Sequence, residues 1–265
     1  MKGRVVEARK PDPIITDPVG CECLEKIKPL LPAELYARVL DREMPSTLAR
    51  YLTLRAMKYD IYAKNFLQES PNGLVVSLGC GFDTRYWRVS KEPWKYVEVD
   101  LPQLIELKKE ILGDIVTYPM IGCSVLEDMW IEEVLSMQRE NVMFLAEGLF
   151  MYLPEEGVRH LFCVLSQSFS KSYIAFDVVN ERYTRGLRKK IVEYKMKRYL
   201  GVDAGTSFQF GVHDAKDMES FGENIKVVEQ WSYLQEKEVL PGFLWHLRNL
   251  KILSRGQYSI RAKIG

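Results

Sequence analysis

Apolar residues in the middle of the chain occur in short runs that alternate with longer amphipathic stretches. Strands of an α/β fold are predicted at Leu74–Leu78, Lys95–Val99, Ile115–Ile121, Asn141–Leu145 and Ser172–Asp177. Helices are predicted between them, at about 84–90, 101–112, 127–139 and 154–170. Strands that alternate with helices of this length form βαβ units around a parallel sheet. Right-handed crossovers then place helices on both faces of that sheet.

The segments that flank this core have different patterns. Residues 1–19 contain several prolines and predict an extended arm, whereas 20–43 and 46–69 have helical spacing. Residues 181–225 are charged and aromatic; they favour a basic amphipathic helix and a lid over the sheet, rather than a partner-binding surface. The tail could add two strands, with candidates at Val227–Trp231, Leu250–Leu253 and Tyr258–Ala262. We therefore expect a helical unit at 1–70 and a sheet-containing core at 71–265.

Composition narrows the class of protein. The 265 residues are 47% hydrophobic, which is enough for a large core, and 37 Lys and Arg balance 36 Asp and Glu. This near-neutral charge weakens a nucleic-acid-binding interpretation. No apolar run reaches the roughly 18 residues that cross a membrane. The five cysteines have no metal-ligand spacing, so we expect reduced thiols, no metal and a cytoplasmic location.

A glycine turn follows the first predicted strand in the sequence VVSLGCGFDTR. Gly79 and Gly81 allow a sharp turn and the close approach of a ligand, and Asp100 ends the next strand, where it can accept hydrogen bonds from ribose hydroxyls. A dinucleotide site would have a third glycine at Thr84 and no acid at Asp83. S-adenosylmethionine carries no phosphate and has cationic groups, so it fits this acidic turn better.

A second acid lies at the same predicted edge of the sheet. Glu147 ends the fourth strand, in AEGLFMYLPEE, and the following Glu155 and Glu156 already serve the next helix N-terminus. Glu147 therefore has no obvious structural duty, and the sequence predicts a place for it near the methionine part of a cofactor.

Three segments together resemble the leucine carboxyl methyltransferase family, which includes polyketide O-methyltransferases of the tetracenomycin type. They are VVSLGCGFDTRYWR, EVDLPQLIELKK and AEGLFMYLPEEGV, in that order. The resemblance implies a class I methyltransferase, with a Rossmann-like, mostly parallel seven-stranded sheet, an N-terminal helical extension and a C-terminal lid. It implies S-adenosylmethionine as cofactor and S-adenosylhomocysteine as product. By position, it implies a cofactor site made of Arg55, Gly79, Gly81, Asp100 and Glu147.

Arg55 would grip the cofactor carboxylate, since a guanidinium can do so with two parallel hydrogen bonds; Arg50 is a weaker alternative. The sequence departs from the family pattern after the third strand, where the family has an aspartate that reads the adenine amino group. Here Ser124, Val125 and Leu126 occupy the expected place, and adenine recognition would rest on their backbone.

The resemblance leaves the methyl acceptor open between a small carboxylic or hydroxyl-bearing molecule and the C-terminal leucine of a protein phosphatase. We expect the small molecule. A carboxylate acceptor is ionised at neutral pH and needs alignment more than a base, so no catalytic acid or base is assigned. Tyr152 matches a family position that could orient the acceptor.

Other classes of function are less well supported. An inactive cofactor-binding scaffold would explain the missing acid, but it would not need Gly79, Gly81, Asp100 and Glu147 together. An NAD-dependent oxidoreductase would need the third glycine. A nucleic-acid methyltransferase would need a base-flipping motif and a basic surface.

Overall fold

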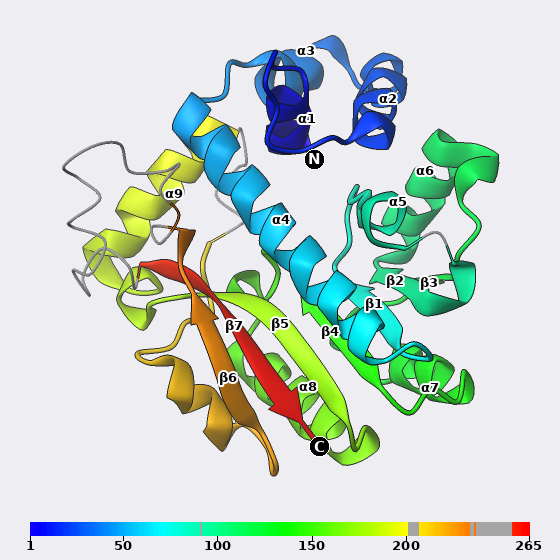
Figure 1. Ribbon diagram of the computed structural model, residues 1–265. Coiled ribbons are helices and arrows are strands. Elements are labelled where there is room, and N and C mark those ends of the chain that lie inside the picture. Colours follow the sequence, from blue (N-terminus) through cyan, green and yellow to red (C-terminus); the bar gives the residue numbers. More distant parts are fainter. Residues whose placement is uncertain (91, 201–206, 234–235, 237–255) are drawn as a thin grey trace.

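A seven-stranded sheet forms the centre of the computed structural model, which describes residues 1–90, 92–200, 207–233, 236 and 256–265 (Figure 1). The strand order is β3-β2-β1-β4-β5-β7-β6. Neighbours among β1 to β5 are parallel, and β7 is antiparallel to both β5 and β6. The strands are β1 (Leu74–Leu78), β2 (Tyr96–Asp100), β3 (Met120–Gly122), β4 (Val142–Ala146), β5 (Ser172–Val179), β6 (Lys226–Trp231) and β7 (Gln257–Ile264). The predicted mostly parallel α/β fold is confirmed.

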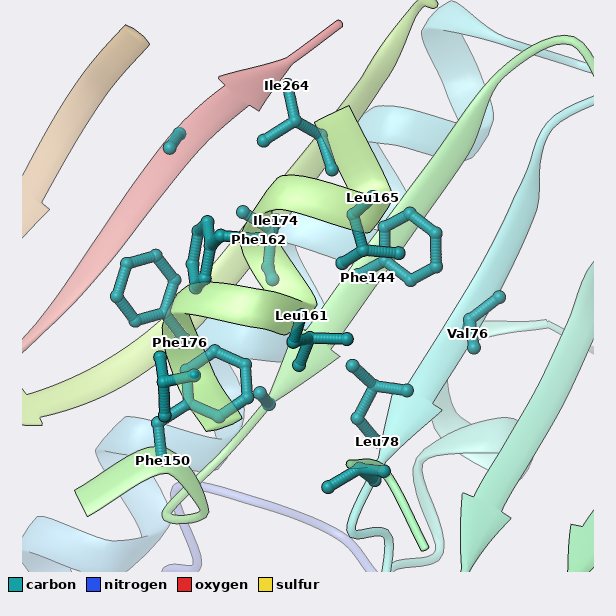
Figure 2. Close-up of a cluster of buried hydrophobic side chains, with 14 of the residues drawn as sticks. Val76, Leu78, Phe144, Phe150, Leu161, Phe162, Leu165, Ile174, Phe176 and Ile264 are labelled. Carbon is teal, nitrogen blue, oxygen red and sulfur yellow. The ribbon is translucent and has the colours of Figure 1, made fainter. Parts of the chain in front are cut away.

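Both faces of the sheet are buried, which explains why apolar residues dominate its central strands. Successive side chains of a strand point to opposite faces. Val76 and Leu78 of β1 therefore pack with Phe144 of β4 in one core, together with Leu161 and Phe162 of α8 (Glu155–Ser168) (Figure 2). α7 (Met129–Ser136) adds Trp130 to the same core.

The opposite face is covered by the long helix α4 (Ser46–Glu69), which runs across the sheet (Figure 1). Its buried Tyr59, Tyr62 and Phe66 pack with Val75 and Met143, the strand residues between those of the first core. Two further helices, α5 (Arg85–Val89) and α6 (Pro102–Leu112), follow β1 and β2. α4 thus places side chains from the N-terminal part of the chain against the sheet, near the ends of its strands.

The prolines of residues 1–19 predicted an extended arm, and this prediction is wrong for the first residues. α1 (Lys2–Ala8) is a helix that packs against α4, with Val5 1% exposed and Arg4 5% exposed. The prolines lie beyond it, and Pro18 is the first residue of α2 (Pro18–Ile27), whose N-cap is Asp17. Proline is well suited to the first turn of a helix, because the N–H groups there have no partner within the helix.

The segment 20–43, predicted to be helical, is helical but interrupted. Lys28–Leu30 forms a 3₁₀ turn (η1), Ala33–Tyr36 a short helix (α3) and Ala37–Asp41 a π-helical turn (η2). Pro29 and Pro32 explain the break, because proline lacks the backbone N–H that continues a helix. The strand predicted at Ile115–Ile121 shrinks to β3, since Gly113–Ile115 is a 3₁₀ turn (η4) and Pro119 precedes the strand.

The described residues of the last third include the helix α9 and the strands β6 and β7. The basic segment forms α9 (Gly186–Leu200), as predicted, and η7 (Ala215–Ser220) precedes β6. The candidate strand Leu250–Leu253 lies outside the described residues. Three further 3₁₀ turns are η3 (Pro93–Lys95), η5 (Phe150–Tyr152) and η6 (Glu181–Tyr183).

Candidate functional site

The glycine turn after β1 uses its two glycines differently. Gly79 has φ +59° and Gly81 has φ +50°, a left-handed conformation that favours glycine. A Cβ added to Gly79 would lie 2.7 Å from Cδ1 of Leu149, whereas one added to Gly81 would have no atom within 4 Å. Gly79 therefore makes room for a side chain of the protein itself, and Gly81 presents bare backbone to open space.

Asp100 lies directly against this open backbone. Its Oδ2 accepts the Gly81 N–H at 2.7 Å, and its Oδ1 accepts the Leu101 N–H at 2.8 Å. The residue is 9% exposed. Each carboxylate oxygen has a second lone pair, so Asp100 can accept further hydrogen bonds beside Gly81.

The loop after β3 is joined to the same strand end. The Cys123 N–H donates to the Asp100 carbonyl at 2.9 Å. Ser124 Oγ accepts the Leu126 N–H at 3.3 Å, and the Glu127 N–H donates to the Ser124 carbonyl at 3.0 Å. Ser124 is thus engaged in local turn bonds, which leaves it poorly suited to replace the aspartate of the family pattern.

Glu147 joins two arginines from distant parts of the chain. Its Oε1 accepts from Arg55 Nε at 3.1 Å and its Oε2 from Arg85 Nη2 at 2.5 Å. The interpretation that Glu147 has no structural duty is therefore wrong. Burial opposes the ionisation of Glu147, but Arg55 and Arg85 outweigh it and lower the pKa of its carboxyl below the ordinary value.

Arg55 lies between two carboxylates. Besides Glu147, it approaches Asp177, with 3.4 Å between Nη1 and Oδ2. Burial disfavours its charge, yet Asp177 and Glu147 outweigh burial and raise its pKa well above the ordinary value. Arg55 is thus a fixed cation close to Gly148. A Cβ added to Gly148 would lie 3.1 Å from Nη2 of Arg55.

Asp177 was not singled out by the sequence analysis. It is 1% exposed and accepts hydrogen bonds from the Gly148 backbone and from Tyr59 and Ser259. Burial raises the pKa of its carboxyl, although all these groups are donors. The signal in the sequence was an acid inside the otherwise apolar strand IAFDVV, since a buried acid requires partners.

A buried ionic network joins the glycine turn to the N-terminal helices. Burial opposes the charge of Asp83, but Arg85, Arg4 and Arg88 outweigh it and hold its pKa well below the ordinary value. Asp83 also accepts the Thr84 N–H at 2.8 Å. Arg85 thus braces the glycine turn through its ion pairs, and Asp83 serves the same turn. The ion-paired residues of this network are Arg4, Asp17, Asp60, Asp83, Arg85, Arg88 and Glu147.

The aspartate at the start of α2 completes this network. Asp17 Oδ1 accepts from Thr84 Oγ1 at 2.6 Å, and its Oδ2 accepts from Arg4 Nε at 2.9 Å. Burial opposes its ionisation, but Arg4 and Arg88 outweigh it, so that the pKa of Asp17 is lowered. The first two helices are therefore attached to the turn by buried ion pairs.

Aromatic side chains gather next to Arg55. The ring of Tyr51 lies 4.3 Å from that of Tyr233, and the guanidinium of Arg55 is 5.7 Å from the Tyr51 ring. Tyr152, which is half-buried, packs at 5.6 Å against Phe208. Burial raises the pKa of the Tyr152 hydroxyl, the nearby Arg55 acting in the opposite direction. We call Tyr51, Tyr152, Phe208 and Tyr233 the aromatic cluster.

Other kinds of site find no support in the part of the chain that the structure describes. It contains no group of three His, Cys, Asp or Glu residues that could hold a metal ion. No helix within it is long and apolar enough to cross a membrane. All five cysteines lie in the described part and are free thiols, as predicted.

Comparison with known proteins decides the family. The sequence model of leucine carboxyl methyltransferase matches residues 1–166, more than half of the chain. The chain belongs to the leucine carboxyl methyltransferase family. Membership of this family confirms the predicted class of enzyme, a methyltransferase, and the predicted methyl donor, S-adenosylmethionine. The match begins at residue 1, so the family pattern includes the N-terminal helices that hold Arg4 and Asp17.

Two individual proteins illustrate the relationship. The tetracenomycin polyketide synthesis O-methyltransferase TcmP of Streptomyces glaucescens is 27% identical over 235 residues, which cover 88% of this chain and 80% of that protein. The crystal structure of a SAM-dependent methyltransferase from Anabaena variabilis has a TM-score of 0.52 and 12% identity, and the match covers 91% of this chain and 95% of that one. The second likeness supports the class I methyltransferase fold alone.

Proposed function

We propose that this methyltransferase transfers the methyl group of S-adenosylmethionine to a carboxylate or hydroxyl oxygen of a small molecule with a flat, apolar body, such as a polyketide-like acid. The observation that carries the proposal is the aromatic cluster beside Arg55, at the strand ends where Gly81 and Asp100 also meet. The relationship to TcmP, an O-methyltransferase of polyketide synthesis, supports the same class of acceptor.

The arrangement around Gly81 fits the cofactor. The space that a Cβ would fill is open, and the acceptor oxygens of Asp100 lie beside it, as a ribose with two hydroxyls requires. The backbone of Ser124, Val125 and Leu126 would meet the adenine. Arg55 would hold the carboxylate of the amino-acid part, and Glu147 would hold Arg55. Bound S-adenosylmethionine supplies an electrophilic methyl group on a sulfonium and leaves as S-adenosylhomocysteine.

The protein has to align the acceptor rather than activate it. A carboxylate is already ionised, and methyl transfer is an in-line displacement that depends on orientation. Tyr152 and Phe208 would lie against the acceptor and exclude water, and the Tyr152 hydroxyl would orient one oxygen. A hydroxyl acceptor would in addition need a proton acceptor, for which we nominate no residue.

We further propose that residues 1–70 complete this site and that 181–225 form a lid over the core at 71–265. Arg55 and Tyr51 come from the first unit and Phe208 from the second. The contacts of Arg55 with Glu147 and Asp177, and that of Phe208 with Tyr152, support this assignment of the two segments.

The family description favours a second candidate acceptor, the free C-terminal leucine of a protein. The experiment that separates the two supplies S-adenosylmethionine with a labelled methyl group. It offers the enzyme either aromatic and aliphatic carboxylic acids or a peptide that ends in leucine. Label in an aromatic acid or its phenol supports our proposal, and label only in the peptide overturns it. Cofactor binding without transfer to any acceptor would instead support an inactive binding protein.

A further inference from the structure

The carboxylate of Asp177 divides its contacts between the scaffold and the candidate cofactor site. Its Oδ1 accepts from the Tyr59 hydroxyl of α4 at 2.9 Å and from the Ser259 hydroxyl of β7 at 2.5 Å. Its Oδ2 accepts from the Gly148 N–H at 2.7 Å and lies 3.4 Å from Nη1 of Arg55. One oxygen thus anchors Asp177, and the other holds residues next to the cofactor.

The two contacts of Oδ2 belong to a closed ring of interactions. Gly148 follows Glu147 directly, and Glu147 holds Nε of the same Arg55 whose Nη1 faces Asp177. Gly148 has φ +68°, so the Glu147–Gly148 backbone is held in a left-handed turn. A shift of the Asp177 oxygen would therefore move Arg55 both directly and through Glu147.

Burial makes this ring rigid. Asp177 is 1% exposed, whereas the side chains of Arg55 and Glu147 are 15% and 14% exposed. A charge-assisted hydrogen bond in such surroundings fixes orientation strongly, since water cannot replace a lost partner. Arg55 is the cation of the ring and is 15% exposed, whereas Asp177 is its most deeply buried support.

We propose that Asp177 is a positioning residue that orients Arg55 for the carboxylate of S-adenosylmethionine. The inference rests on the proposed cofactor site. Asp177 would not contact the cofactor. Its effect would be confined to the amino-acid part, because the adenosine part would be held by Asp100 and Gly81, which are hydrogen-bonded to each other. This separation makes the inference testable with two ligands.

The test compares Asp177→Asn with Tyr59→Phe and Ser259→Ala, by calorimetric titration with S-adenosylmethionine and with 5′-methylthioadenosine, which lacks the amino-acid part. Asparagine keeps an oxygen for Tyr59 and Ser259 but turns an NH₂ group towards the Gly148 and Arg55 donors. We expect Asp177→Asn to weaken S-adenosylmethionine binding by roughly 10- to 100-fold. Binding of 5′-methylthioadenosine should stay within about twofold in all variants. Each control keeps the Asp177 carboxylate and one of its two anchoring hydroxyls. It should therefore lower the urea midpoint and weaken S-adenosylmethionine binding much less than Asp177→Asn does.

The possible outcomes distinguish a failure of the proposed cofactor site from a failure of the positioning role of Asp177. Wild-type protein that binds neither ligand overturns the proposed cofactor site itself. Equal losses for both ligands in Asp177→Asn, or no loss beyond that of the controls, overturn the positioning role while the site stands. A further variant, Arg55→Met, should reproduce the selective loss; if it does not, Asp177 does not act through Arg55. If Asp177→Asn does not fold, Asp177→Ser removes the same charge and leaves room for a water molecule.

Discussion

Replacement of Gly81 by alanine tests two properties of this glycine separately. One is its left-handed backbone conformation, and the other is its proposed contact with the cofactor. Gly81 has φ +50°, and a Cβ would meet no atom within 4 Å. The change should therefore lower the free energy of unfolding only by the left-handed backbone penalty, about 1–2 kcal/mol. For a chain of this size the melting temperature should fall by roughly 2–4 °C per kcal/mol.

The effect on ligand binding should be much larger. If the cofactor lies against this backbone, the methyl group of alanine takes its place, and S-adenosylmethionine affinity should fall by more than about tenfold, or 1.4 kcal/mol. Calorimetric titration gives the affinity, and urea unfolding gives the stability of the ligand-free protein. Both are needed, because a stability loss alone would show only strain.

Gly113→Ala is the matched control. Gly113 caps α6 with φ +61°, and a Cβ there also meets nothing within 4 Å. Gly113→Ala should leave cofactor affinity unchanged. Its stability cost should be at least as large as that of Gly81→Ala, because φ +61° with ψ −141° is a backbone conformation nearly restricted to glycine. Our reasoning is refuted if Gly81→Ala binds S-adenosylmethionine as tightly as Gly113→Ala does, since the cofactor would then not lie on Gly81.

Three further predictions concern stability and can be checked by urea unfolding. Gly79→Ala should cost about 1 kcal/mol more than Gly81→Ala, because Leu149 has to move away; equal costs would contradict the packing described. Asp17→Asn should lower the free energy of unfolding at pH 7, and this free energy should then depend less on pH in the acid range. The folded-state pKa of Asp17 is depressed, so its contribution is present above about pH 4 and is lost as pH falls further; an unchanged acid limb would argue against this ion pair. Lys108→Met should cost about 3–5 kcal/mol, because it leaves the buried Glu98 carboxylate, 2.7 Å from Nζ, without its cation. The double variant with Glu98→Gln should recover part of that loss, and simple additivity of the two losses would contradict a coupled pair.

Elements with a strong local pattern were predictable from the sequence. The prediction of β1 over Leu74–Leu78 and of a helix over 46–69 agrees with the structure at both ends. The apolar run of β1 stops at glycine, and α4 starts after Pro45 and ends before Pro71. These boundaries depend on backbone chemistry within a few residues, which a sequence displays directly.

The N-terminal segments were predicted less well because their conformation depends on tertiary contacts. The composition of residues 1–19 favours an extended chain, yet α1 is helical because Val5 and Arg4 find buried partners on α4 and the glycine turn. Local propensity is readily overridden by burial of this kind. By contrast, the proline breaks inside 20–43 were visible in the sequence.

The residues of the candidate site could be predicted from the sequence, but the contacts that hold them in place could not. Gly81 and Asp100 were expected side by side from the parallel topology, and they are hydrogen-bonded. The partners of Glu147 and the role of Asp177 could not be predicted, since most of these contacts join residues 62 or more positions apart. The pairing of buried charges over such distances is set by the packing of the whole fold.

The place of β7 within the sheet has a consequence for synthesis of the chain. Gln257–Ile264 are translated after both β5 and β6, yet they insert between these two strands. Until they leave the ribosome, β5 keeps an open edge on that side, β6 lacks this neighbour, and Asp177 lacks the hydroxyl of Ser259. An incomplete chain would expose a strand edge that invites association with other chains. Closure of the sheet and completion of the donors around Asp177 therefore both wait for the synthesis of β7.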